Sequence, residues 1–218
     1  MRRDTSAKII SRLEDTYGEP VPDLVFRNNY ELTIAVVLSA QTTDRQVNGV
    51  TQELFLKYPD FTSLASAPLR DIEKIIRSTG FYRVKAANIK ALSRSICEKH
   101  KGSIPATSQE LTSLPGVGRK SANVILSIGF GIPALAVDTH VARISFRLGY
   151  TEHKNPDNVE KDLCTVIPEA DWKKTHLLFI KHGRSLCTAR NPRCSVCPVN
   201  AFCRHFRGIS LAAHPCKG

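Results

Sequence analysis

The chain has 218 residues, of which 42% are hydrophobic, so it can bury the core of one large domain or two small ones. No apolar run reaches the roughly 18 residues that a membrane-spanning helix needs, and Lys8, Arg12 and Glu14 interrupt the place where a signal peptide would be apolar. The formal net charge of +11 indicates a polyanionic partner, nucleic acid above all. We therefore expect a soluble, cytoplasmic, nucleoid-associated protein with no membrane contact.

Helical periodicity dominates the chain, and no convincing strand pattern occurs. The expected helices are, in order, one that ends at Gly18; the apolar stretch 31–40, capped by Asn28 or Asn29; one capped by Thr42 or Thr43 that carries Val47, Val50, Leu54 and Phe55; one opened at 66–68 and closed by Gly80; one with Ala86, Ile89, Leu92 and Ile96 that ends at Gly102; and one started by Asn155 and Pro156. The connections are short, so the sequence predicts a compact all-α protein. The segment 129–135, GFGIPAL, interrupts the apolar pattern and is a candidate crossing between two lobes.

The stretch LPGVGRK (114–120) lies between helical patterns at 107–113 and 119–129. Gly116 and Gly118 can adopt positive φ and leave backbone N–H groups bare at the start of the second helix. A helix N-terminus attracts anions, so a DNA phosphate fits there without any base being read. An ordinary helical corner is the alternative, but the adjacent Arg119 and Lys120 favour DNA binding.

Lys120 has two possible roles, as a phosphate contact or as a nucleophile. A lysine amine attacks only when it is unprotonated, and lowering its pKa by ~3 units requires roughly 4 kcal/mol of differential stabilisation. The helix start, partial burial and the neighbouring Arg119 all act in that direction.

Asp138 follows an apolar run and precedes a new helical pattern. It is expected to N-cap the helix that starts at Thr139, and a capping carboxylate can also polarise a reacting sugar or move a proton. His140 and Arg143 lie one turn further on and can reach phosphates.

Four cysteines fall within 17 residues, spaced C-x6-C-x2-C-x5-C: Cys187, Cys194, Cys197 and Cys203. Such a tight group indicates a metal centre rather than disulfides. Zinc ribbons have two CxxC knuckles and this loop has one, which favours a [4Fe–4S] cluster over zinc. The surrounding loop is basic, so the cluster either holds Arg190 and Arg193 against DNA or has a redox role. The other cysteines are expected in the core (Cys97 and Cys164) or are incidental (Cys216).

Together these features resemble the endonuclease III family of DNA glycosylases over about residues 4–211. The resemblance is carried by LSAQTTD (38–44), STGFYRVKAANI (78–89), LPGVGRKSANVIL (114–126), AVDTHVARI (136–144) and the four cysteines. It implies a six-helix barrel with a helix-hairpin-helix at 22–132, an iron–sulfur lobe formed by 1–21 and 133–218, and an active-site cleft between them.

The resemblance also implies roles for individual residues. Lys120 matches the nucleophile and Asp138 the catalytic carboxylate. Gln41 matches a residue that fills the gap left by a flipped-out base, and Phe81 stands where the family often has a leucine wedge. Asp44 and His140 match polar residues of the cleft.

The activity implied is a bifunctional DNA glycosylase and AP lyase of base excision repair, acting as a monomer on double-stranded DNA with damaged pyrimidines or abasic sites. A flipped nucleotide would be attacked by Lys120 to form a Schiff base, and β-elimination would cleave the strand on the 3′ side. One alternative is an adenine-mismatch glycosylase, which lacks the lysine and carries a further C-terminal domain. The other is a non-catalytic iron–sulfur protein that binds DNA or senses redox state, which would not need Lys120 and Asp138 together.

Overall fold

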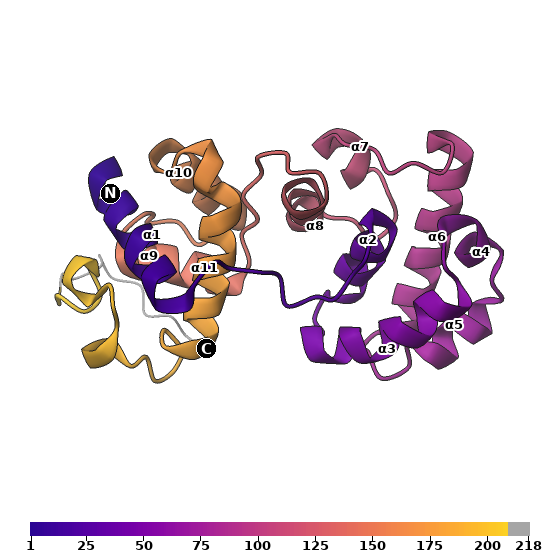
Figure 1. Ribbon diagram of the computed structural model, residues 1–218, viewed down its shortest axis with the longest axis horizontal. Coiled ribbons are helices and arrows are strands. Elements are labelled where there is room, and N and C mark those ends of the chain that lie inside the picture. The colour runs from indigo at the N-terminus through magenta and orange to yellow at the C-terminus, as the bar shows by residue number, and fades with distance from the viewer. Residues whose placement is uncertain (209–218) are drawn as a thin grey trace. The chain divides into compact units, whose positions relative to one another are not determined.

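The computed structural model describes residues 1–208, and every regular element within them is helical (Figure 1). The α-helices are α1 (Arg3–Tyr17), α2 (Asn29–Leu38), α3 (Asp44–Lys57), α4 (Phe61–Ser66), α5 (Leu69–Ile75), α6 (Tyr82–His100), α7 (Ser108–Thr112), α8 (Arg119–Val124), α9 (Thr139–Leu148), α10 (Pro156–Val166) and α11 (Trp172–Ser185). The shorter elements are the π-helical turn η1 (Ile125–Gly129) and the 3-10 turns η2 (Glu169–Asp171), η3 (Cys194–Val196) and η4 (Asn200–Phe202). The expectation of an all-α fold is confirmed. No helix within residues 1–208 is long and apolar enough to cross a membrane.

Side-chain caps set most helix starts. Where the sequence left two candidates, Asn28 caps α2 by accepting from the Glu31 N–H at 3.0 Å, and Thr43 caps α3. Asn155 caps α10 with Pro156 in the first turn, as expected. The helix expected to run to Gly80 instead ends at Ile75. The reason is a tight turn, because both the backbone N–H and the buried hydroxyl of Thr79 donate to the Ile76 carbonyl, at 2.9 and 2.8 Å.

The chain divides into two compact units. One is formed by Pro22–Ala134, and the other by Met1–Val21 together with the chain from Leu135 onward. The division falls within the proline–glycine segment 129–135.

The 22–134 unit is built around α2, in which every residue from Tyr30 to Leu38 is buried. A helix that is apolar all round must be enclosed by others. The long helix α6 packs against α4 and α5, and α8 with η1 packs on α2 (Figure 1).

In the other unit, α11 packs against both α1 and α9 (Figure 1). Fully buried side chains from all three helices form its core, including Ile9, Leu13, Val141, Leu178 and Phe179. This packing fixes α9, whose N-cap is Asp138, against α11, which leads into the cysteine loop.

Candidate active site and metal centre

The hairpin between α7 and α8 has buried apolar side chains on one side and solvent-exposed residues on the other. Leu114 and Val117 are buried, whereas Gly118, Arg119 and Lys120 are exposed. Gly116 has a φ of 77°, and a Cβ there would lie 3.0 Å from Asn88 Cβ and 3.1 Å from Val37 Cγ1. Gly116 is thus required both for its backbone conformation and for close packing.

Gly118 differs from the expectation of positive φ. It lies at the N-cap of α8 with a φ of −90°, and a Cβ there would meet nothing within 4 Å. Any residue can adopt this backbone conformation, so the missing side chain only leaves the surface above the first N–H groups of α8 uncovered.

Lys120 is the second residue of α8, and its side chain is exposed. The partial burial expected from the sequence is therefore wrong. Within residues 1–208 its amine makes no hydrogen bond or ion pair, so it is available to a ligand.

Gln41 and Phe81 have the same unusual backbone. Apart from Lys101, they are the non-glycine residues with positive φ between residues 1 and 208, at 53° and 57°. Such conformations cost about 1 kcal/mol or more each and are held by their surroundings. A Cβ at Gly80 would lie 4.0 Å from the Gln41 carbonyl oxygen, so the two loops are neighbours. Phe81 is 69% exposed, which is unusual for an aromatic residue.

The Gln41 loop is tied to the start of α6 by a buried lysine. Lys85, only 5% exposed, donates from Nζ to the Thr42 hydroxyl at 2.5 Å. Burial lowers the pKa of Lys85. Asp44, also expected at the site, is the first residue of α3, directly after this loop, and is half-buried.

Asp138 caps α9, as the sequence predicts, because its Oδ1 accepts from the Val141 N–H at 2.8 Å. Its Oδ2 has no hydrogen-bond partner within the described part of the chain. One oxygen therefore holds the helix while the other remains available for chemistry.

His140 and Arg143 are bound to each other. Arg143 donates from Nη2 to His140 Nδ1 at 3.1 Å and to the Gly183 carbonyl at 3.0 Å, and from Nε to the Cys187 carbonyl at 3.1 Å. Burial lowers the pKa of His140, and the adjacent Asp138 carboxylate opposes this. Arg143 thus links α9 to the start of the cysteine loop.

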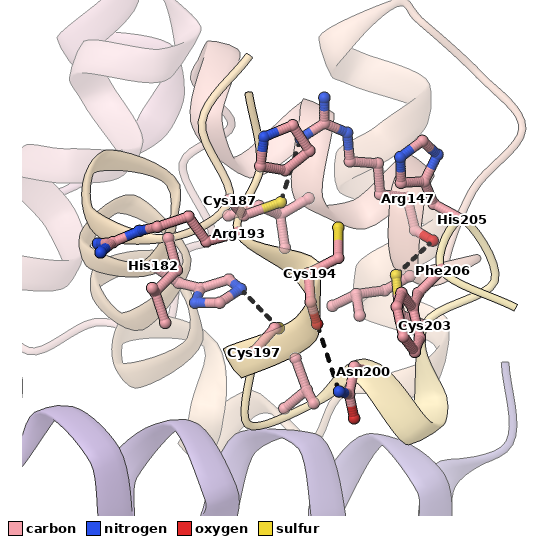
Figure 2. A pocket seen from close by; sticks show the side chains of 15 residues that line it. Arg147, His182, Cys187, Arg193, Cys194, Cys197, Asn200, Cys203, His205 and Phe206 are labelled. Atoms are coloured by element: carbon pink, nitrogen blue, oxygen red, sulfur yellow. Dashed lines mark hydrogen bonds between the residues drawn. The ribbon is translucent and has the colours of Figure 1, made fainter. Parts of the chain in front are cut away.

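The four clustered cysteines line one hollow (Figure 2). Its remaining wall is largely apolar, with Ile144, Leu148, Leu186, Val199 and Phe206 among the lining residues. None of the four forms a disulfide. Burial raises the pKa of the Cys197 thiol to about 11 and also raises that of Cys203, so these thiols need a cation to become thiolates.

Two side chains bring hydrogen-bond donors to the cysteine sulfurs (Figure 2). Arg147 of α9 donates to Cys187 Sγ at 3.3 Å and to the carbonyls of Thr188 and Ala189, both at 2.8 Å. His182 of α11 has Nε2 3.6 Å from Cys197 Sγ. Four free thiols around a largely apolar hollow, with donors to sulfur, fit a [4Fe–4S] cluster, which takes one thiolate per iron. Within residues 1–208, no three His, Cys, Asp or Glu side chains are placed to hold a single metal ion.

The two arginines of the cysteine loop lie at the protein surface, and the cysteines outside the loop are a separate case. Arg190 and Arg193 are both exposed, and Arg193 directs its guanidinium away from the cysteines onto the Ser185 carbonyl at 2.9 Å (Figure 2). Cys97 and Cys164 are only partly buried rather than enclosed in the core, and Cys164 packs against the core of its unit. Cys216 lies outside the described residues.

The sequence patterns did not indicate four residues that hold the site residues or the cysteines in place: Lys85, Arg147, His182 and Tyr17. For Arg147 a signal existed, because it follows Arg143 by four residues on α9 and shares its face. For Tyr17 none existed, since its partner His182 is 165 residues away.

The chain matches proteins of known class over most of its length. Residues 34–169 match the HhH-GPD superfamily of base excision DNA repair proteins, and residues 187–203 match the iron–sulfur binding domain of endonuclease III. An endonuclease III of Bacillus subtilis (strain 168) is 45% identical over 196 residues, 89% of this chain and 90% of that relative. One of Synechocystis sp. is 42% identical over 203 residues, 93% of each chain. A solved structure of a trapped endonuclease III–DNA covalent intermediate is 43% identical, covers 95% of this chain and 98% of its own, and superposes with a TM-score of 0.90.

The helical fold, the hairpin and the cysteine loop thus define a helix-hairpin-helix base excision DNA repair protein. Within that class, the chain belongs to the endonuclease III family. It is a DNA glycosylase with AP lyase activity, and it carries a [4Fe–4S] cluster.

Proposed function

We propose that the chain acts as a monomer on double-stranded DNA, removes oxidised or ring-saturated pyrimidines and cleaves the strand 3′ to the abasic site. The proposed enzyme is cytoplasmic and associated with the nucleoid. Its two units are proposed to be a barrel that carries the hairpin and a lobe that holds the cluster. The observation that carries it is Lys120: an exposed, unpartnered amine directly after a hairpin whose N–H groups are bare. A relative has been trapped as a covalent intermediate with DNA.

The hairpin binds the DNA backbone in this proposal. Val117 and Leu114 hold the turn in the core, and Gly116 and Gly118 let a phosphate approach the start of α8. Arg119, which is exposed beside them, adds positive charge. None of these contacts reads a base, so they place the sugar rather than select the lesion.

Gln41 and Phe81 contact the distorted duplex at the flipped-out base in this proposal. Two adjacent loops with left-handed residues present an amide and an exposed ring, which suits filling a gap and wedging between bases. Asp44 is the polar residue that follows the Gln41 loop. Flipping costs least for a poorly stacked base, which supplies part of the selectivity.

The reaction uses Lys120 and Asp138. The Lys120 amine forms a bond to C1′ as the bond from C1′ to the base breaks, and the base departs with a proton. The Asp138 carboxylate, through Oδ2, stabilises the positive charge that develops on the sugar. The opened sugar is then held as a Schiff base. Loss of a C2′ proton expels the 3′ phosphate, and water releases Lys120.

The remaining expected residues have supporting roles. Cys187, Cys194, Cys197 and Cys203 would ligate the cluster, whose binding orders the loop that carries Arg190 and Arg193. These exposed arginines would then contact phosphates. His140 would contact a phosphate with its ring. Any phosphate contact of Arg143 must come from Nη1, since Nε and Nη2 are bound to protein carbonyls and to His140.

Borohydride trapping on a duplex with a single abasic site tests the nucleophile. The wild type should form a covalent adduct, and Lys120→Gln should form none while still binding the duplex. An adduct in both proteins would assign the nucleophile to another amine. No adduct in either would contradict the lyase mechanism.

Asp138→Asn separates the two roles of Asp138, because an asparagine amide oxygen can also accept the Val141 N–H. The melting temperature should stay near that of the wild type, while release of a damaged pyrimidine slows about 100-fold or more. Trapping on a preformed abasic site should fall much less, since no base has to leave. Unchanged base release would leave Asp138 as a helix cap only.

A further inference from the structure

A chain of hydrogen bonds connects the N-terminal helix to one of the clustered cysteines. The Tyr17 hydroxyl, at the end of α1, lies 2.8 Å from Nδ1 of His182. On the other side of the ring, His182 Nε2 lies 3.6 Å from Cys197 Sγ, within reach of an N–H···S bond. The His182 side chain is buried, with 1% of its residue exposed, so water does not compete for either nitrogen.

The two partners determine where the ring proton lies. A thiolate only accepts hydrogen bonds, so the ring nitrogen that faces Cys197 Sγ must carry a proton. In a neutral imidazole the other nitrogen, Nδ1, is then an acceptor, and it needs a donor. Tyr17 is that donor, because its hydroxyl can give its proton to Nδ1.

Ser185 completes the arrangement. Its hydroxyl oxygen lies 3.0 Å from the Tyr17 hydroxyl and 2.8 Å from the Lys181 carbonyl. A Tyr17 hydroxyl that donates to His182 keeps its oxygen lone pairs for Ser185. The single Ser185 proton can go either to the Tyr17 oxygen or to the Lys181 carbonyl. With a Tyr17 hydroxyl that donates to His182, the directions of the bonds from Tyr17 through His182 to Cys197 agree.

We propose that Tyr17 and His182 form a relay that donates a hydrogen bond to Cys197 and thereby raises the reduction potential of the bound cluster. Both are positioning residues. His182 acts through the Cys197 sulfur, and Tyr17 acts through His182. The proposal rests on Cys197 being a cluster ligand.

The physical reason lies in the charge on sulfur. Hydrogen bonds to the ligating sulfurs are among the determinants of iron–sulfur potentials, because they stabilise the more negative, reduced state. A partner on the far nitrogen of a histidine fixes the tautomer and the orientation of its ring. Removing the Tyr17 hydroxyl therefore weakens the bond at Cys197 without touching a ligand.

The test compares Tyr17→Phe with Tyr150→Phe in the cluster-loaded protein. The control removes another tyrosine hydroxyl of the same unit, one that bonds to Ser6 Oγ of α1 at 2.8 Å and not to His182. The midpoint potential is measured by direct electrochemistry, in which the electrode supplies and accepts the single electron. The iron–sulfur stretching bands are recorded by resonance Raman in H₂O and D₂O.

The expected result is a more negative potential and a reduced deuterium shift in Tyr17→Phe, with both values unchanged in Tyr150→Phe. Identical potentials in the wild type and Tyr17→Phe would overturn the relay. Cys197→Ser distinguishes this failure from a wrong ligand set. If that variant keeps the wild-type cluster spectrum, Cys197 is not a ligand and the premise itself fails.

Discussion

Gly183 of α11 lies directly against His140 of α9. A Cβ added at Gly183 would stand 2.8 Å from His140 Nδ1 and 3.0 Å from Arg143 Nη2. The same arginine donates to the Gly183 carbonyl. The close approach of the two helices therefore joins the segment that starts at Asp138 to the helix that leads into the cysteine loop.

Gly183→Ala should destabilise this unit. Overpacking a tight contact costs typically 1–3 kcal/mol, and here the atoms displaced belong to a hydrogen-bonded pair. We expect a lower melting temperature and slower base release, measured by calorimetry and by single-turnover kinetics.

Gly49→Ala is the matched control, since Gly49 lies in α3 and a Cβ there would meet nothing within 4 Å. Alanine is the better helix former by roughly 1 kcal/mol, so this variant should be as stable as the wild type or more so. Equal stability of Gly183→Ala and Gly49→Ala would show that α9 and α11 can separate without cost.

The two hairpin glycines should differ in their effect on stability, although replacing either should weaken DNA binding. Gly116→Ala forces a side chain into a left-handed conformation and against Asn88, so it should lower the unfolding free energy by about 2 kcal/mol and weaken DNA binding as well. Gly118→Ala should leave stability unchanged but weaken binding, because its methyl group stands where a phosphate approaches the N–H groups of α8.

Thermal unfolding and duplex affinity at one fixed salt concentration check both variants, since phosphate binding depends steeply on salt. Wild-type affinity in Gly118→Ala would mean that no phosphate approaches the backbone there.

Local sequence signals predicted the features that depend on neighbouring residues. Asp138 as a helix cap, Asn155 with Pro156 at a helix start and Gly18 at a helix end each follow from bonds within a few residues. The cysteine loop is also local, which is why its spacing was informative.

Features that depend on contacts between distant segments could not be read in this way. The choice of Asn28 over Asn29 and the left-handed Phe81 depend on such contacts, whereas the early end of α5 follows from the local bonds of Thr79 to the Ile76 carbonyl. The positive φ expected at Gly118 is not found, because glycine permits positive φ but does not require it. The burial of Lys85 was likewise invisible, since a lysine in a helical pattern is ordinarily solvated.

Lys85→Met should slow catalysis without weakening the fold. Its amine is buried with a hydroxyl as partner, so an apolar replacement removes a desolvation cost and should preserve or raise the melting temperature. The Thr42 tether is lost, however, and Gln41 should leave its strained conformation. We expect base excision to fall about tenfold, equivalent to roughly 1.4 kcal/mol.

Lys90→Met is the control, because Lys90 also lies on α6 and donates from Nζ to a loop oxygen, the Ala67 carbonyl at 2.5 Å. It should leave base excision unchanged. Equal rates for Lys85→Met and the wild type would show that the Gln41 loop holds its shape without the tether.

Arg147→Met should make the cluster easier to lose. Arg147 joins the Cys187 sulfur to two carbonyls of the same loop, so its removal frees three acceptors at once and loosens the first cysteine. Mutation of residues that support a metal ligand typically lowers metal affinity 10–100-fold, and a faster decay of the cluster's visible absorbance under air and chelator would report this.

Arg193→Met is the comparison, because Arg193 also donates to a backbone carbonyl but contacts no cysteine sulfur. It should keep the wild-type decay rate while weakening DNA binding. Equal decay in all three proteins would mean that the thiolate–iron bonds alone hold the loop.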